Sequence, residues 1–358
     1  EEVFVFGNPP YLGSRNQEEE HKADMDIVFG NQKEFKGYRK LDYISCWFFK
    51  GAEYVANSDA SYAFVSTNSI TLGEQVSILW NNMLNKYSEN IFFAYSVFKW
   101  NNNAKNVAGV SVVIIGVRKR DNSMKKLYNE VECKQLSHIP PTLSDSVDNM
   151  VKKATKSISK LPYMRRGNMP NDKEFLRLSP LEKKDILEHY PNAVKFIRLQ
   201  IGADELINQV ERYCYWISDE DLEEAEKIMP IKNAIDKCRE YRINSKDKTL
   251  HVQAEKAHQM REFFECNEMS LVIPIVSSES REYIPMSFVP DKTIVPNSAQ
   301  VIYDANLFVF GILTSKMHIL WTKHNAGRLD NRIRYSIFLC YNTFPFPSIS
   351  DTKKSEIE

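Results

Sequence analysis

The amino-acid sequence predicts an α/β sheet in its N-terminal part, followed by a second domain of mixed α+β structure. Between Val3 and Val117, apolar runs that suit strands alternate with helical patterns, as in an α/β sheet. The sequence becomes charged and polar around Arg118–Asp121, and Ser137–Asp148 has the composition of a linker. Because 358 residues exceed one average domain, we expect two domains, at 1–136 and 137–358.

The N-terminal domain should contain strands and helices in alternation. The expected strands are Val3–Phe6, Ser61–Ser66, Ile91–Phe98 and Val110–Val117, and the expected helices are Asp42–Val55 and Glu74–Leu84. The last two strands are too close in sequence for a helical crossover. They should therefore form an antiparallel pair at one edge of the sheet.

The C-terminal domain mixes both types of element. Ser179-Pro180-Leu181-Glu182 predicts a helix start, with an N-cap serine, proline at the first helical position and glutamate in the capping-box position. The other expected elements are strands at Arg212–Ile217, Leu271–Val276, Tyr283–Val289, Gln300–Tyr303 and Arg334–Cys340, an acidic helix at Asp219–Lys227, and one long apolar helix at Ala305–Lys323.

A basic segment without any acid follows the linker. It runs from Val151 to Gly167 after an N-cap signal, so we expect a basic helix. The helix either presents a solvated face or contacts nucleic-acid phosphates, and both interpretations stay open. Its candidate phosphate ligands are Lys152, Lys153, Arg165 and Arg166.

Composition argues against a membrane protein or a zinc protein. Lys+Arg and Asp+Glu both total 47, yet a zero net charge does not exclude nucleic acid, because binding needs only local basic density. The six cysteines are scattered and the histidines lack ligand spacing, so we expect buried, reduced thiols and no metal site. Without a secretory signal or an apolar run that could span a bilayer, a cytoplasmic protein is expected.

Asn8-Pro9-Pro10-Tyr11 directly follows the first apolar strand and is the most informative feature. Adenine N6 is a poor nucleophile, so an enzyme that methylates it needs acceptors for both N–H bonds. The Asn8 side chain and the Pro9 carbonyl can supply them, and Tyr11 can stack on a base flipped out of the duplex. The alternative is a simple turn that ends a strand, but the α/β elements that follow favour the catalytic interpretation.

The tetrapeptide resembles the motif IV loop of amino-methyltransferases, and further segments resemble the MmeI-like family of type II restriction–modification enzymes. The most specific are residues 64–76 (FVSTNSITLGEQV) and residues 98–102 leading into the strand at 110–116. The resemblance continues at residues 167–172, 195–198, 212–214, 277–279, 283–286, 310–318 and 341–345, so it covers nearly the whole chain.

The resemblance implies the C-terminal half of a class I methyltransferase (Rossmann-like) sheet, strands four to seven, followed by a DNA target-recognition domain. The expected activity is adenine-N6 methylation of double-stranded DNA with S-adenosyl-L-methionine. The glycine-rich turn that binds this cofactor is not found here. Since Glu1-Glu2 leads straight into a strand without an initiator Met, we expect a fragment that needs the upstream part of its polypeptide. Alone it should be inactive, with an exposed edge at Val3–Phe6 that favours self-association.

Base-pair recognition requires Arg, Lys, Asn, Gln or carboxylate side chains in the major groove. The segment 327–335 (GRLDNRIRY) concentrates them, and by position the resemblance favours Asp330 and Arg332, with Arg328 beside them. A surface Asp–Arg ion pair is the alternative. A second loop, 277–281, offers Arg281. Phe98 and Trp100 either line the flipped-base pocket or pack in the core, and Glu74 and Gln75 have no assigned role.

Two other functions remain open. An RNA or protein-glutamine methyltransferase can use the same loop, although such enzymes usually need little sequence after the catalytic sheet. A non-catalytic DNA-binding specificity module is the second alternative, against which the intact Asn8–Tyr11 loop argues. The sequence shows no nuclease motif, and the target sequence and oligomeric state do not follow from it.

Overall fold

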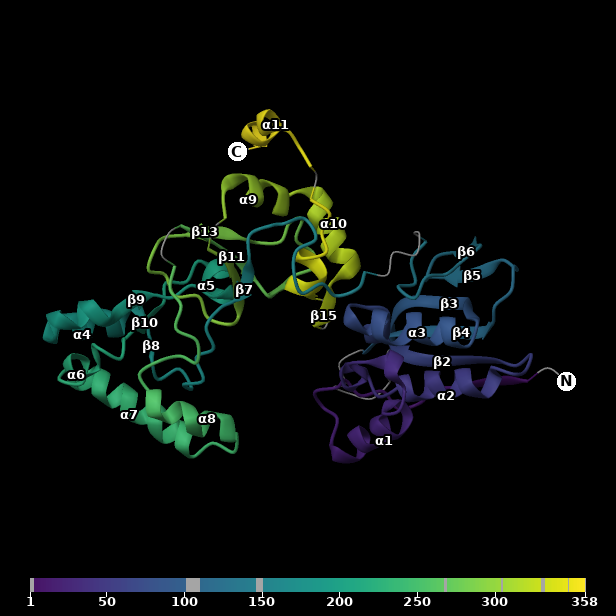
Figure 1. Cartoon of the computed structure of the whole chain (residues 1–358), viewed down its shortest axis with the longest axis horizontal. Helices are drawn as coiled ribbons and strands as arrows, with labels where there is room; N and C mark the ends of the chain where they lie inside the picture. Colours follow the sequence, from purple (N-terminus) through teal and green to yellow (C-terminus); the bar gives the residue numbers. More distant parts are fainter. Residues whose placement is uncertain are drawn as a thin grey trace. The chain divides into compact units, whose positions relative to one another are not determined.

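The computed structural model describes residues 3–100, 110–145, 151–266, 269–303, 305–329, 332–346 and 348–357. The chain divides into two compact units (Figure 1). The first comprises Glu1–Ala154 and His324–Asp330, and the second comprises Thr155–Lys323 and Asn331–Glu358. The boundary expected between residues 136 and 137 stays a prediction.

The first unit is built on a six-stranded sheet with the order β1-β2-β4-β3-β5-β6. The strands are β1 (Phe4–Gly7), β2 (Ser61–Thr67), β3 (Glu89–Trp100), β4 (Val110–Lys119), β5 (Lys125–Tyr128) and β6 (Cys133–Leu136). β1 pairs with β2 in parallel, whereas β4 runs antiparallel to both β2 and β3. The four predicted strands and the antiparallel pairing of the last two are confirmed. Their expected place at an edge of the sheet is wrong, because β5 and β6, which were not predicted, extend the sheet beyond β3.

Helices cover one face of this sheet (Figure 1). They are α1 (Glu19–Phe29), α2 (Ser45–Val55) and α3 (Asn81–Lys86). The apolar side of α2 is buried: the Phe48 ring lies 5.4 Å from the Phe64 ring of β2 and 5.1 Å from the Trp80 ring. The helix expected at Glu74–Leu84 is confirmed, and Val76–Trp80 forms a π-helical turn within it before α3 begins.

β1 forms an edge of the sheet, because β2 is the only described strand that pairs with it. Side chains alternate across a strand, so Val5 packs on the core whereas Phe4 and Phe6 are 62% and 82% exposed. The predicted exposure of the Val3–Phe6 edge is therefore confirmed.

The second unit contains two antiparallel sheets and a pair of short strands. One sheet has the order β13-β11-β14-β7 and the other β8-β10-β9. Their strands are β7 (Met164–Arg166), β8 (Arg177–Leu178), β9 (Ile197–Leu199), β10 (Tyr213–Tyr215), β11 (Ser270–Pro274), β13 (Ser287–Val289) and β14 (Ala299–Ile302). β12 (Val276–Ser277) pairs with β16 (Arg332–Arg334), whereas β15 (Gly327–Leu329) belongs to the first unit.

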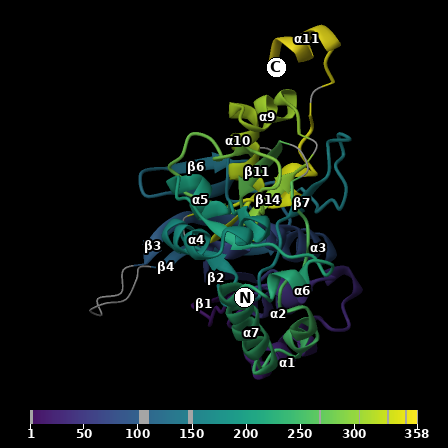
Figure 2. The ribbon, with the colours of Figure 1, turned by 90° about the vertical axis from the view of Figure 1, so that its left-hand side faces the viewer.

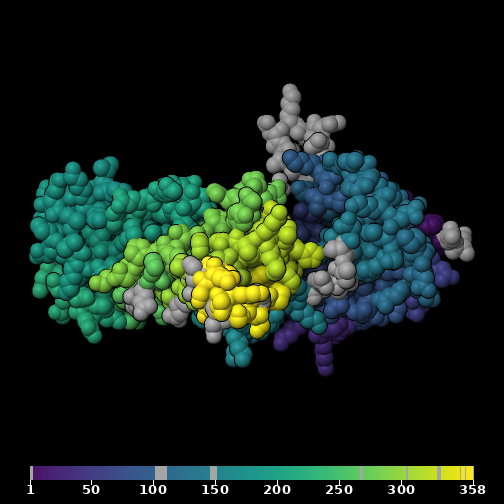
Figure 3. Space-filling model, turned by 90° about the horizontal axis from the view of Figure 1, so that it is seen from above, coloured from purple at the N-terminus to yellow at the C-terminus, as the bar shows by residue number. Residues whose placement is uncertain are grey.

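Helices surround these strands. They are α4 (Pro180–His189), α5 (Ala203–Asn208), α6 (Leu222–Ala225), α7 (Met229–Ile243), α8 (Lys248–Gln253), α9 (Leu307–Leu313), α10 (Lys316–Asn325) and α11 (Asp351–Ile357). The capping box predicted for α4 is confirmed, with Ser179 and Glu182 bonding reciprocally. α11 lies beside α9 (Figure 2), and the C-terminal residues lie on the surface of this unit (Figure 3).

Four expectations for the second unit are corrected. Residues 151–163 contain no helix, only a bend at 155–156 and a turn at 158–159 before β7, so the basic segment is irregular. The helix expected at Ala305–Lys323 is divided, because the Thr314 hydroxyl bonds to the Phe310 carbonyl and Ser315 caps the next helix through the His318 N–H. Arg334–Cys340 is not one strand, since a π-helix occupies Ile337–Tyr341. The acidic helix expected at Asp219–Lys227 is reduced to α6.

The cysteines are all free thiols, and five are buried. Cys133 is exposed, contrary to expectation, because it lies on the edge strand β6. Within the described ranges, no helix is long and apolar enough to cross a lipid bilayer. In the same ranges, no group of three or more His, Cys, Asp or Glu side chains could hold a metal ion.

Candidate functional site

The carboxyl ends of β1, β2 and β3 meet at one edge of the sheet, because these three strands run in the same direction. Gly7 of β1 is paired with Phe64 of β2, while Thr67 of β2 and Phe98 of β3 are both paired with Val112. Ligands of α/β sheets bind at this kind of edge. The strand ends therefore bring the Asn8–Tyr11 loop to the same edge as Phe98 and Trp100.

The Asn8–Tyr11 loop combines an anchor with an accessible amide. Pro9 is buried and Tyr11 is half-buried against the core of the unit, whereas Asn8 and Pro10 are exposed. Since proline fixes its own backbone angle, the buried Pro9 restricts how the loop leaves β1. The Asn8 side chain remains open to a ligand.

The two aromatic candidates on β3 lie outside the described core of the first unit. Phe98 is half-buried and Trp100 is 42% exposed, and their ring centroids are 6.3 Å apart. This exposure favours the pocket-lining interpretation over core packing for Trp100. Both assignments stay predictions.

Asp42 connects the loop to the rest of this edge, and the sequence interpretation gave it no role. One carboxylate oxygen accepts the Leu12 N–H at 2.8 Å and the Ile44 N–H at 3.3 Å. The other accepts the hydroxyls of Thr67 and Ser69, each at 3.2 Å. The only feature of the sequence that points to Asp42 is its position as an acidic residue just before an apolar helix.

Glu74 and Gln75, which had no assigned role, both have partners in the first unit. Gln75 accepts the Asp42 N–H at 2.8 Å, and Glu74 forms ion pairs with Lys40 at 2.9 Å and Lys153 at 3.3 Å. Burial alone would raise the pKa of Glu74, but these two lysines outweigh it and hold the pKa below its ordinary value. Lys153, expected at a phosphate, is thus engaged with Glu74.

The structure brings the two candidate recognition loops together. Antiparallel pairing places Val276 opposite Arg334 and Ser277 opposite Ile333, so the 278–281 turn follows a strand that adjoins Arg332. Both Arg281 and Arg332 are exposed. Arg328 is partly buried, and Asp330 lies outside the described residues.

The four candidate phosphate ligands belong to different units. Lys152 and Lys153 lie in the first, and Arg165 and Arg166 lie on β7 of the second. The Arg165 guanidinium stacks 3.4 Å above the Phe264 ring, whereas Arg166 and Lys152 are exposed.

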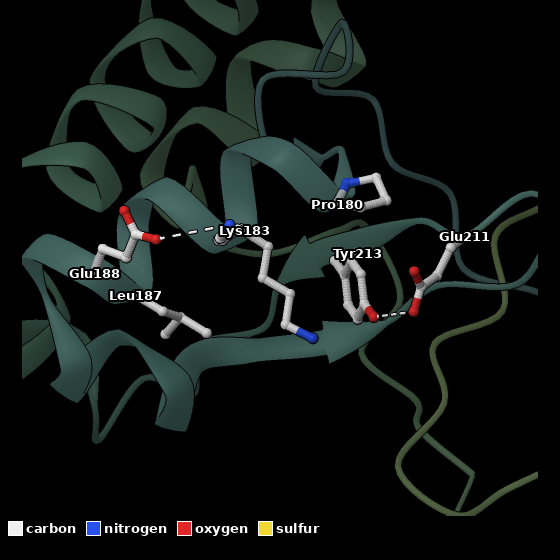
Figure 4. Close-up of a pocket in the computed structure, with 7 residues that line it drawn as sticks. Pro180, Lys183, Leu187, Glu188, Glu211 and Tyr213 are labelled. Carbon is white, nitrogen blue, oxygen red and sulfur yellow. Dashed lines mark hydrogen bonds and ion pairs between the residues drawn. The ribbon is translucent and has the colours of Figure 1, made fainter.

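The second unit also has a surface cavity of about 430 Å³ between α4 and the residues around β10 (Figure 4). The Lys183 ammonium lies 3.6 Å from the centre of the Tyr213 ring, and the Tyr213 hydroxyl bonds to Glu211. No site residue predicted from the sequence lines this cavity.

Comparison with known families identifies both parts of the chain. Residues 1–129 match the model of the MmeI DNA-methyltransferase domain, and residues 145–348 match that of the MmeI target recognition domain. The chain belongs to the MmeI family. The predicted resemblance and fold class are thereby confirmed.

Two relatives give the scale of the similarity. The chain is 46% identical over 359 residues to DNA methyltransferase A of Bacillus subtilis strain 168, of which it spans 40%. It is also similar to the solved structure of the Type IIL restriction–modification enzyme MmeI in complex with DNA. There the TM-score is 0.92 at 36% identity, and the match covers 99% of this chain and 48% of that one. The chain thus spans less than half of either relative.

Proposed function

We propose that this chain is part of a site-specific DNA adenine-N6 methyltransferase of a restriction–modification system. The observation that carries the proposal is the exposed Asn8 amide beside the buried Pro9, at the carboxyl end of β1, in a chain of the MmeI family. An exposed asparagine beside a proline that restricts the turn can offer its side-chain oxygen to an amine substrate.

In this proposal the target adenine is flipped out of the duplex and enters the sheet edge. The Asn8 side-chain oxygen and the Pro9 carbonyl accept the two N6 hydrogens, so that the nitrogen lone pair can point at the methyl group. Tyr11 stacks on the base, and Phe98 or Trp100 lies on its other side. S-adenosyl-L-methionine supplies the methyl group.

The loops at residues 277–281 and 327–335 are proposed to recognise the double-stranded target. Arg281 and Arg332, with Arg328 and Asp330, are candidates for contacts with base edges, and one good bidentate contact is worth roughly 1–3 kcal/mol of discrimination. Support comes from the pairing that joins the two loops. Lys152, Arg165 and Arg166 would hold phosphates and position the duplex. The pairing of Lys153 with Glu74 makes it the weakest phosphate candidate.

We further propose that most of the cofactor site comes from the upstream part of the whole protein. The sequence holds no glycine-rich D/F-x-G-x-G turn, and the outer edge of β1 is unpaired with Phe4 and Phe6 exposed. The chain's own contribution would be Asn8 and Pro9 on the methyl-facing side. The isolated chain should therefore be inactive, and measurable turnover by it would contradict this part of the proposal.

The two alternatives predict different products. An RNA or protein-glutamine methyltransferase would leave DNA unmodified, and a binding module would modify nothing. The match of residues 145–348 to a target recognition domain favours the DNA enzyme over the first alternative. The accessible Asn8 favours it over the second.

The test uses the full-length protein, expressed in a host that lacks DNA methylation. Modified adenines are mapped by single-molecule sequencing, beside an Asn8→Ala variant. We expect one methylated sequence motif that disappears in the variant. Methylation that persists in the Asn8→Ala variant would remove the loop from the mechanism.

A further inference from the structure

We infer that Asp42 is the positioning residue of the methyltransferase site: it fixes the Asn8–Tyr11 loop relative to the end of β2. The inference rests on the proposed function and deepens it. Asp42 does not touch the reacting atoms, so its effect would act through the loop.

The loop has few hydrogen bonds of its own to hold it. Pro9 and Pro10 have no N–H, so the loop depends on the residue that follows Tyr11. Leu12 is fixed through both of its backbone groups: its N–H donates to Asp42 at 2.8 Å, and its carbonyl accepts the Tyr43 N–H at 3.0 Å. The segment before α2 therefore holds the end of the loop.

The second carboxylate oxygen reaches the neighbouring strand. It accepts the hydroxyls of Thr67, the last residue of β2, and Ser69, and these hydroxyls lie 2.6 Å from each other. One side chain thus joins the segment after β1 to the segment after β2. Any movement of Asp42 would change the separation of these two segments.

The carboxylate is buried and its partners are neutral. Asp42 is only 2% exposed, and its carboxylate accepts from two backbone N–H groups and two hydroxyls. Hydrogen bonds to an ionised acceptor are roughly twice as strong as those between neutral groups. Because the donors come from the segment after β1, from the segment of Asp42 itself and from the end of β2, this arrangement favours one rigid loop position.

The substitution Asp42→Asn tests the role with little change in shape. The asparagine amide keeps one acceptor oxygen, but its NH₂ group donates where the carboxylate accepted, so the Thr67 and Ser69 hydroxyls must reverse. The matched control is Asp26→Asn in the same unit, since Asp26 accepts the Tyr38 hydroxyl at 2.7 Å at the surface. In the full-length enzyme we would measure kcat, the KM and Kd for DNA, the thermal midpoint and the single-turnover amplitude.

We expect Asp42→Asn to lower kcat by about 10- to 100-fold, because misplacement by about 1 Å can cost that much. Asp26→Asn should leave kcat unchanged, and the Kd for DNA should change by less than about threefold in both variants, since phosphate contacts that dominate affinity are unaltered. A kcat of Asp42→Asn equal to that of the control would overturn the inference. The inference would also be overturned if kcat fell only in proportion to the fraction of folded, active enzyme, as measured by the single-turnover amplitude.

A second variant keeps the test decisive if Asp42→Asn does not fold. Thr67→Val combined with Ser69→Ala removes two donors and leaves the carboxylate in place, and it should lower kcat in the same way. Unchanged kcat in that variant would overturn the inference.

Hydrogen exchange separates this inference from the proposed function. In the full-length protein, Asp42→Asn should speed exchange of the Leu12 amide while β2 stays protected, whether or not the enzyme methylates DNA. Unchanged Leu12 exchange would contradict the positioning role. A wild-type protein that does not methylate adenine would instead contradict the proposed function alone.

Discussion

At the residue scale, two buried carboxylates of the first unit are stabilised in different ways. Asp42 receives four donors at the edge of the sheet, whereas Glu89 at the start of β3 accepts only the Tyr62 hydroxyl, and its other oxygen has no partner among the described residues. Burial raises the pKa of Glu89 from 4.5 to about 7, although the hydrogen bond from Tyr62 opposes the shift. Glu89 should therefore make stability depend on pH.

The sign follows from linkage. The pKa of Glu89 is higher in the folded than in the unfolded protein. Its contribution to the free energy of unfolding is therefore fully present below about pH 4.5 and is lost as the pH rises through about 7. The loss is on the order of 3 kcal/mol at most. Glu89→Gln should abolish this dependence, so that the variant becomes more stable than the wild type at pH 8. Denaturant unfolding at pH 5 and pH 8 measures this pH dependence of the free energy of unfolding, with Glu19→Gln as the surface control. Parallel pH profiles for wild type and Glu89→Gln would contradict the account.

The sequence predicted Asn8 and its loop but not Asp42. An apolar strand followed directly by Asn-Pro-Pro-Tyr is a local pattern, and it could be recognised without any knowledge of the fold. The partners of Asp42 are 30 residues away at Leu12, 25 at Thr67 and 27 at Ser69. No periodicity in the sequence indicates contacts at such distances.

At the element scale, apolar periodicity predicted elements that bury a continuous face. β2, β3 and β4 are such elements, and each lies within a residue or two of its expected bounds. β5 and β6 were missed because four-residue strands that contain lysines and few apolar residues resemble loops. The basic segment after residue 150 has helical composition but no apolar face to bury. Composition alone therefore did not make it a helix.

Arg242, in the last turn of α7, connects this helix to the segments around residues 170–171 and 253–259, and it is 1% exposed. Its five N–H groups all donate to backbone carbonyls, those of Pro170, Asn171, Gln253, Lys256 and Gln259, at 2.8–3.1 Å. No local pattern in the sequence predicts this arrangement.

Arg242→Met should destabilise the second unit by more than about 3 kcal/mol, because it leaves five buried carbonyls without donors. Arg242→Lys should recover only part of the loss, since an ammonium has three donors. The control is Arg239→Met one turn earlier, where a surface ion pair with Asp236 at 2.7 Å is worth about 1 kcal/mol or less. Denaturant unfolding, monitored with a probe in the second unit, gives the change in the free energy of unfolding for each variant. Equal losses for Arg242→Met and Arg239→Met would show that the carbonyl contacts do not matter.

At the scale of the whole molecule, the chain combines a methyltransferase part with a target recognition part, each matched by its own family model. It spans 40% of the length of the B. subtilis relative. The domain order and fold class were predicted because specific segments resemble the family along nearly the whole chain. The DNA target sequence could not be predicted, because a loop's composition does not determine which base each side chain contacts.

The most direct measurement is the mass-spectrometric analysis of nucleosides from DNA modified by the full-length enzyme. The account predicts N6-methyl-2′-deoxyadenosine as the modified nucleoside, and its absence when Asn8 is replaced by alanine. A methylated cytosine, or unmodified DNA beside methylated RNA or protein, would contradict the adenine assignment that the Asn8–Tyr11 loop supports.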